Sequence, residues 1–142
     1  MVSMRDPECV FCKIVAGEIP SASVLDRDNV YAFLDLNPVR QGHALVIPKS
    51  HYPTLLDLDP GLAADLLRAQ QDVARAVMLA TGADGVNLGL NLGEAAGQVV
   101  FHAHYHIIPR FHEDGLRLWP QTPYPSQDEM NRLAGEIRAR LG

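Results

Sequence analysis

Five short stretches of this chain are rich in apolar residues, many of them β-branched or aromatic, as is typical of β-strands. Turn-forming residues separate these stretches: Asp28-Asn29 follows the first one, and the glycine-rich segment 93–97 lies between the last two. Short turns of this kind join antiparallel neighbours, so we expect hairpins. The predicted strands cover residues 23–27, 29–35, 43–48, 86–91 and 99–109.

A helical repeat occupies residues 55–80, between the third and fourth predicted strands. Asp59 is a suitable N-cap, Pro60 fits the first turn, and Gly82 ends the pattern. We interpret this segment as the principal helix and its apolar stripe as part of the core. The stripe consists of Leu62, Leu66, Val73 and Val77.

The last part of the chain, residues 111–142, combines an irregular stretch with one more helix. Three prolines interrupt residues 112–125, and residues 126–129 (SQDE) have the pattern of a capping box. The helix carries an apolar stripe of Met130, Leu133, Ile137 and Leu141. Together these patterns predict an α+β fold, a five-stranded antiparallel sheet with two main helices, in a single domain that covers residues 1–142.

Length and composition are those of one folded domain without a nucleic-acid surface. The 142 residues are 47% hydrophobic and 20% charged, which is too apolar for a disordered chain. The net charge of −5 disfavours binding to a polyanion such as DNA or RNA. Residues 1–9 lack the apolar segment of a signal peptide, and no stretch is long enough to be a membrane span. We therefore expect a cytoplasmic protein that binds neither nucleic acid nor membrane.

The most informative stretch for function is HAHYHII, residues 102–108. In a strand, His102, His104 and His106 would project from one face, roughly 7 Å from one to the next. The outer two would then lie roughly 13 to 14 Å apart, too far to share one metal ion without a bend. This spacing favours a reactive middle histidine that its neighbours orient.

A neutral imidazole suits an attack on phosphorus near pH 7, because no proton has to be removed first. Neighbouring imidazoles can bind phosphate oxygens or pass a proton to a leaving group. This division of roles is typical of phosphoryl or nucleotidyl transfer. A zinc-dependent hydrolase is the competing interpretation of the same histidines.

The only two cysteines form a C-x-x-C motif, Cys9 and Cys12. They are too close in sequence to brace a large loop, and such a pair indicates either metal binding or redox chemistry. A thioredoxin-like motif follows a strand, and none is predicted before Cys9. A metal site would need two further ligands from the histidines.

The histidine stretch resembles the His-φ-His-φ-His-φ-φ signature of the histidine triad (HIT) family, where φ is apolar. Further blocks in family order extend this resemblance over residues 9–110, which leaves 111–142 as a variable C-terminal segment ending in a helix. The blocks are residues 9–14, 17–20, 33–35, 42–49, 87–91 and 96–98.

The resemblance implies a division of labour among the histidines. His104 would be the nucleophile that attacks the α-phosphorus, and His106 would contact the phosphate. His43 would lie in the same site, and Gln98 would reach the α-phosphate or the leaving group.

The resemblance also implies a nucleotide-binding surface. Asp35 would hold the ribose hydroxyls, since a carboxylate can accept from two adjacent hydroxyls. Asn91 would contact the ribose or the phosphate region. The apolar wall around the base would be Phe11, Ile14, Phe33 and Leu36.

Family members with an N-terminal C-x-x-C hold a structural zinc ion, and the matching ligands here would be Cys9, Cys12, His51 and His102. Two thiolates and two imidazoles form a closed tetrahedral set. His102 would then hold the strand in place for His104 rather than take part in proton transfer.

By resemblance, the expected activity is hydrolysis of purine nucleoside phosphoramidates or related nucleotidyl conjugates through a nucleotidyl-histidine. The alternatives are a dinucleoside polyphosphate hydrolase (diadenosine tri- or tetraphosphate type) and a nucleotide-binding regulatory or scaffold protein with incidental turnover. The resemblance further implies a homodimer with a sheet that extends across both copies.

For three other residues, the sequence predicts a role less specifically. Arg110 could reach a phosphate, but an ion pair with Glu113 or Asp114 is favoured. His112 is expected in a solvated loop. Trp119 could close over a substrate, but packing at a dimer interface is favoured.

Overall fold

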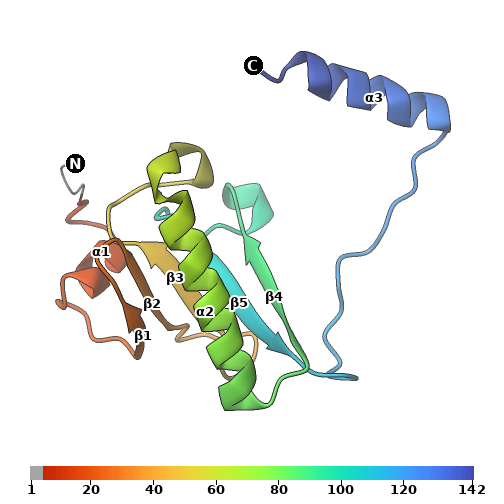
Figure 1. The fold of residues 1–142 in the computed structure, drawn as a ribbon. Helices are drawn as coiled ribbons and strands as arrows, with labels where there is room; N and C mark the ends of the chain where they lie inside the picture. Colours follow the sequence, from red (N-terminus) through yellow and green to blue (C-terminus); the bar gives the residue numbers. More distant parts are fainter. Residues whose placement is uncertain (1–4) are drawn as a thin grey trace.

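The computed structural model describes residues 5–142 and contains one five-stranded antiparallel sheet (Figure 1). Its strand order is β1-β2-β3-β5-β4, and each strand runs antiparallel to its neighbours. This confirms the predicted α+β fold class. The strands are β1 (Ser23–Asp26), β2 (Val30–Leu34), β3 (Ala44–Pro48), β4 (Gly85–Leu90) and β5 (Tyr105–Arg110).

The expected helix over residues 55–80 is divided into two 3-10 turns and one long helix. Leu58 has an extended backbone after the first turn, and Asp59 then accepts from Gly61 N–H as the cap of the second. Helix α2 begins only after this turn and ends at Gly82, which adopts the left-handed conformation. The bounds are η1 (Leu55–Asp57), η2 (Pro60–Leu62) and α2 (Ala63–Thr81).

Three further helical segments complete the structure. The sequence analysis did not predict α1 (Val10–Val15), a helix whose N-cap is Cys9. A 3-10 turn, η3 (Glu94–Ala96), follows β4. The predicted C-terminal helix is present as α3 (Gln127–Ala139), with the Ser126 side chain accepting from Glu129 N–H. No helix within residues 5–142 is long and apolar enough to cross a membrane.

The sheet has apolar side chains on both faces, and each face has its own core. Ala44 and Val46 of β3 face the α2 side, whereas Leu45 and Ile47 face the α1 side. This alternation explains why every residue of β3 is buried. Helix α2 covers one face, and α1 packs against the other face near β2 and β3 (Figure 1).

The prediction of a strand over residues 99–109 is wrong for its first half. Strand β5 begins at Tyr105, so His102 and His104 precede the sheet. Ala103 donates its N–H to Tyr52 O at 2.7 Å instead of pairing with a strand. The simple alternation of a strand therefore does not place the three histidines, and they are free to face different surroundings.

Candidate active site and metal cluster

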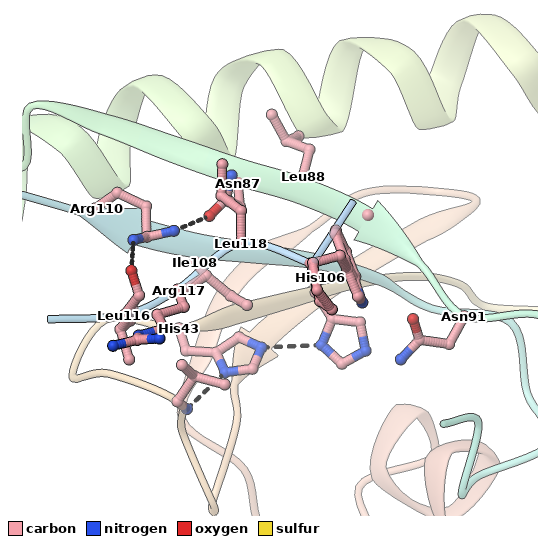
Figure 2. A pocket seen from close by; sticks show the side chains of 14 residues that line it. His43, Asn87, Leu88, Asn91, His106, Ile108, Arg110, Leu116, Arg117 and Leu118 are labelled. Atoms are coloured by element: carbon pink, nitrogen blue, oxygen red, sulfur yellow. Dashed lines mark hydrogen bonds between the residues drawn. The ribbon is translucent and has the colours of Figure 1, made fainter. Parts of the chain in front are cut away.

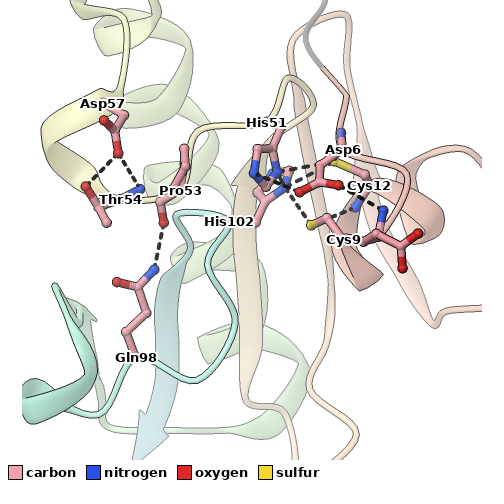
Figure 3. Close-up of polar contacts among 10 residues, drawn as sticks. Asp6, Cys9, Cys12, His51, Pro53, Thr54, Asp57, Gln98 and His102 are labelled. Carbon is pink, nitrogen blue, oxygen red and sulfur yellow. Dashed lines mark hydrogen bonds and ion pairs between the residues drawn. The ribbon is translucent and has the colours of Figure 1, made fainter.

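Two thiols and two imidazoles meet between α1, the end of β3 and the start of the histidine stretch (Figure 3). The Nδ1 atom of His102 lies 3.4 Å from Cys9 Sγ and 3.6 Å from Cys12 Sγ. The Nδ1 atom of His51 lies 3.5 Å from Cys12 Sγ and 3.3 Å from that of His102. All four ligand atoms lie within 4.8 Å of one another, as the zinc hypothesis requires.

The backbone fixes which nitrogen of His102 faces this cluster. Its Nε2 atom lies 2.8 Å from the carbonyl oxygen of Pro48, which can only accept, so Nε2 carries the proton. The lone pair of Nδ1 then points at the sulfurs. Burial lowers the pKa of His102 to about 4, so the ring is neutral as a metal ligand must be.

The two thiols and helix α1, which positions them, are also suited to binding a metal ion. Cys9 Sγ accepts from Cys12 N–H at 3.4 Å as the cap of α1, which holds both sulfurs on one side of the turn. Burial raises the pKa of the Cys12 thiol, and a cation between the sulfurs would favour the thiolate instead. Two sulfurs and two oriented imidazoles are a donor set that zinc prefers.

His104 has the opposite arrangement of its ring nitrogens. Its Nδ1 lies 2.8 Å from the carbonyl oxygen of His102, so Nδ1 donates and Nε2 keeps a lone pair. The side chain is buried, and the edge-on ring of Phe11 lies 5.1 Å away between centroids. The protein therefore presents Nε2 of His104 as an oriented nucleophile.

A hydrogen-bonded chain sets the tautomer of His106. Val39 N–H donates to His43 Nδ1 at 3.0 Å, so the proton of neutral His43 sits on Nε2. That Nε2 lies 2.9 Å from Nδ1 of His106, which must accept. The Nε2–H group of His106 is therefore left as a donor, and this buried atom has no hydrogen-bond partner among residues 5–142. The rings of His104 and His106 lie 4.9 Å apart between centroids.

The surroundings keep these imidazoles uncharged. Burial lowers the pKa of His104 and His43, although the carboxylate of Asp35 opposes the shift in both. Burial and the neighbouring histidines lower the pKa of His106 to about 4. At neutral pH the site thus offers one lone pair, on His104, beside one N–H donor, on His106.

The structure brings some of the predicted nucleotide-binding residues to this site. Asp35 Oδ2 lies 3.7 Å from His43 Nε2, and its Oδ1 accepts from Asn37 N–H at 2.9 Å. Phe11 contacts His104, and Phe33 packs edge-on against Phe11 with centroids 5.4 Å apart.

Three other predicted site residues lie in the core, at the surface and in the loop around η3. Ile14 is buried in the core under α1, and the Leu36 side chain is 83% exposed. Gln98 is buried, its Nε2 donating to Pro53 O at 2.7 Å and to Val100 O at 3.1 Å, while its Oε1 accepts from Gly93 N–H. Its amide thus holds the loop around η3. A contact between Gln98 and the phosphate stays a prediction.

A cavity of about 460 Å³ opens against His43 and His106 on the side of β4 (Figure 2). Asn91 lines it, together with Asn87 and residues 116–120, of which the sequence indicated only Trp119 as a residue that could close over a substrate. Asn87 is opposite Ile108 in the β4–β5 register, so strand pairing brings it there. For residues 116–120, a segment without regular structure, no sequence pattern could have indicated this position.

Arg110 connects β4 and the loop after β5, which both line this cavity. Its Nε donates to Asp114 Oδ2 at 2.7 Å, which confirms the favoured ion pair with an acid of the following loop. Its Nη1 and Nη2 donate to Asn87 Oδ1 at 2.6 Å and to Leu116 O at 3.0 Å. The His112 side chain is 91% exposed, as expected for a solvated loop.

Comparisons with known proteins agree with this fold and site. A family model of the HIT domain matches residues 16–113. The chain is 48% identical over 137 residues to Protein hit of Bacillus subtilis, with 94% of each chain covered. It is 39% identical over 135 residues to adenosine 5'-monophosphoramidase hnt1 of Schizosaccharomyces pombe, covering 94% of this chain and 98% of that protein. The chain therefore belongs to the HIT family.

A longer relative and two solved structures complete the comparison. Adenylylsulfatase HINT3 of Arabidopsis thaliana is 47% identical over 109 residues, which are 77% of this chain and 55% of that protein. The crystal structure of SMU.412c from Streptococcus mutans has a TM-score of 0.90 at 42% identity, covering 96% of this chain and 87% of that one. A zinc-bound histidine triad protein from Mycobacterium smegmatis has a TM-score of 0.74 at 37% identity, covering 94% and 98%.

Proposed function

We propose that this protein hydrolyses purine nucleoside phosphoramidates or related nucleotidyl conjugates through a covalent nucleotidyl-histidine on His104. The observation that carries the proposal is the pair of oriented nitrogens, a lone pair on His104 Nε2 and an N–H on His106 Nε2. An acceptor and a donor side by side match an electrophilic phosphorus and its non-bridging oxygen.

In the first step, His104 Nε2 attacks the α-phosphorus and the bond from phosphorus to the leaving nitrogen breaks. The attacking ring becomes positively charged, and its Nδ1–H bond to the His102 carbonyl oxygen, 2.8 Å long in the free protein, strengthens as it does. His106 Nε2–H donates to a phosphate oxygen. The leaving amine gains a proton from water, which the cavity beside His106 admits.

In the second step, water attacks the phosphorus from the side opposite His104 and loses a proton to the solvent. The bond between phosphorus and His104 Nε2 breaks, which releases the nucleoside monophosphate and leaves His104 neutral. His43 acts through His106 and is a positioning residue in this scheme. The Asp35 carboxylate would accept from the ribose hydroxyls. Phe11 and Phe33 would form one wall of the base site, together with the predicted contributions of Ile14 and Leu36.

We further propose that Cys9, Cys12, His51 and His102 hold a structural zinc ion. Bound there, zinc would supply a cross-link between α1, the end of β3 and the histidine stretch. The donor set and the zinc-bound relative from M. smegmatis support this assignment. The link to function is direct, because His102 gives its side chain to the cluster and its carbonyl oxygen to His104.

A catalytic zinc on Asp35, His43 and His106 is the weaker alternative. Suitable atoms of these residues lie within 4.8 Å of one another. However, the Val39 N–H occupies Nδ1 of His43 and directs its proton to Nε2, the atom that would have to bind the metal. A metal ion there would displace that proton and break the bond to His106.

The same proposal includes two expectations, one about the cellular compartment and one about the oligomeric state. We expect the protein in the cytoplasm, where both thiols stay reduced, and we expect two copies to pair through β4. Imaging of a fluorescent fusion tests the first expectation, and a compartment other than the cytoplasm would contradict it. The mass of the protein in solution tests the second, and a monomer at micromolar concentration would contradict it.

The activity test compares adenosine 5'-phosphoramidate, adenylyl sulfate and diadenosine tri- and tetraphosphate as substrates. We expect the phosphoramidate to give the highest kcat/KM and His104→Ala to abolish its turnover. His112→Ala, at an exposed position outside the site, is the matched control and should retain full activity. A preference for the polyphosphates would favour the alternative hydrolase, and nucleotide binding without turnover would favour a regulatory role.

A further inference from the structure

Helix α3 stands away from the rest of its own chain. The ribbon after β5 runs out past the edge of the sheet and places α3 at a distance from α2 and the strands (Figure 1). None of its residues is buried, and within residues 5–142 it makes no extensive contact with another helix or strand. Its own protomer therefore gives this helix little tertiary packing.

The helix carries an apolar stripe that needs a partner. Leu133, Ile137 and Leu141 are 38%, 57% and 75% exposed, and Met130 continues the same face one turn earlier. A helix of 13 residues is marginal in water without tertiary packing. The stripe therefore indicates a surface that covers it in the working protein.

The connecting segment keeps α3 from folding back. Residues 116–126 contain Pro120, Pro123 and Pro125 and have no regular structure. Proline-rich segments are stiff spacers of about 3.1 Å per residue, so these 11 residues can hold α3 roughly 34 Å from the sheet. A stiff spacer before an amphipathic helix is suited to reaching another molecule.

The sheet edge from which this arm leaves points to a second copy of the chain. Strand β4 is an edge strand, and its sequence GVNLGL has no charge and no proline to block pairing. Leu88 on this edge is 49% exposed. Arg110, where the arm begins, is opposite Gly85 of β4 in the register. A copy paired along β4 would thus lie directly beside the start of the arm.

The extended arm is also compatible with a solved relative. The crystal structure of SMU.412c matches this chain with a TM-score of 0.90 over 96% of its length. The unmatched 4% of 142 residues is about six residues, fewer than the 13 of α3. The aligned part of that relative, at 42% identity, therefore includes at least part of α3.

We propose that α3 of each copy packs its apolar stripe onto the second copy, so that two chains exchange their C-terminal arms. Domain exchange of this kind needs an element that is detached from its own core and a stiff connection, and the chain has both. Because residues 116–120 line the cavity beside His106, the anchored arm also holds that wall in place. This inference concerns assembly and stands independently of the proposed substrate.

Dilution of the full-length protein, followed by light scattering after size exclusion, tests the role of the stripe. Ile137→Asp should raise the dimer dissociation constant at least tenfold. Asn131→Asp adds the same charge on another face of α3 and keeps the oxygen that accepts from Gln127, so it should change the constant less than twofold. Equal behaviour of the two variants, or a wild type that is monomeric at micromolar concentration, would overturn the proposal. Circular dichroism checks that both variants remain folded.

A photo-cross-link identifies the molecule that α3 contacts. Leu141→p-benzoylphenylalanine places the reactive group at the end of the stripe, and an equal mixture of light and ¹⁵N-labelled chains is irradiated after subunit exchange. We expect cross-linked peptides of mixed isotope composition that join α3 to the core of another chain. Peptides joining α3 only to its own chain, or irradiation without any cross-link, would contradict the exchange of arms.

Discussion

The metal cluster and the reactive histidine group use the same residue type from one short stretch, yet they expose opposite nitrogens of the ring. The Pro48 carbonyl oxygen takes Nε2–H of His102 and leaves Nδ1 for the sulfurs. The carbonyl oxygen of His102 takes Nδ1–H of His104 and leaves Nε2 for the substrate. Two backbone oxygens thus decide which ring nitrogen keeps its lone pair, Nδ1 in His102 and Nε2 in His104.

This comparison shows that a histidine's role depends on the partner of its second nitrogen more than on its position in the motif. Burial lowers the pKa of both rings, so neutrality alone does not distinguish them. Their surroundings do: thiols face His102, whereas His104 lies between Phe11 and His106. The predictions below separate these two environments.

The largest expected effect is the loss of the nucleophile. His104→Gly should lower kcat/KM by about 10³-fold or more, because nothing else offers an oriented lone pair to phosphorus. Added imidazole should restore part of the activity of this variant, since a free ring can occupy the space. Steady-state kinetics with and without imidazole measure both effects, and undiminished turnover would refute the assignment.

Removal of the metal should affect stability more than chemistry. Chelation, or Cys12→Ser, is expected to lower Tm by about 10 °C or more, because the cross-link between α1 and the histidine stretch is lost. Activity per folded molecule, measured well below Tm, should fall only a few-fold. Calorimetry and metal analysis check this result. A protein with unchanged Tm but no activity would instead indicate a catalytic ion.

A smaller effect is expected from the tautomer chain through His43. His43→Leu cannot donate to His106 Nδ1 and should lower kcat by about 10- to 100-fold with little change in KM. His43→Gln keeps an N–H donor and should recover much of this loss. A purely structural role for His43 would give equal losses in the two variants together with a lower Tm.

The smallest effect concerns pH. The pKa of His106 is about 4, so this ring stays neutral well below the ordinary histidine value of about 6.5, and burial also lowers the pKa of His43. We expect kcat/KM to hold between pH 7 and about pH 5 and to fall as the pH approaches 4, when His106 gains a proton. A midpoint of inactivation near pH 6.5 would contradict the lowered pKa values.

The fold was largely predictable, because the continuous apolar run in residues 44–48 and the helical repeat in 62–77 report burial directly. The cluster of cysteines and histidines followed from the family resemblance. Helix α1 was missed, since six residues are too few to show a helical period. The placement of His102 and His104 was also missed, because Ala103 bonds to Tyr52, distant in sequence, and the strand begins only at Tyr105.

The cavity wall shows a second limit of sequence analysis. Residues 116–120 have no period, and contacts of Arg110 with Asp114 and Leu116 help to hold them near His106. For Gln98, the family resemblance implied a contact with phosphate, and no local pattern indicated that its buried amide bonds three backbone groups. Hydrogen bonds between distant loops are not encoded in a local pattern.

The most direct test of the account is mass spectrometry of the protein after rapid acid-free quenching during turnover of adenosine 5'-phosphoramidate. We predict a nucleotidyl adduct on the peptide that contains His104, formed at a rate equal to or faster than kcat and absent from His104→Ala. An adduct on His102 or His106, or full turnover by His104→Ala, would contradict the assignment of the reactive nitrogen.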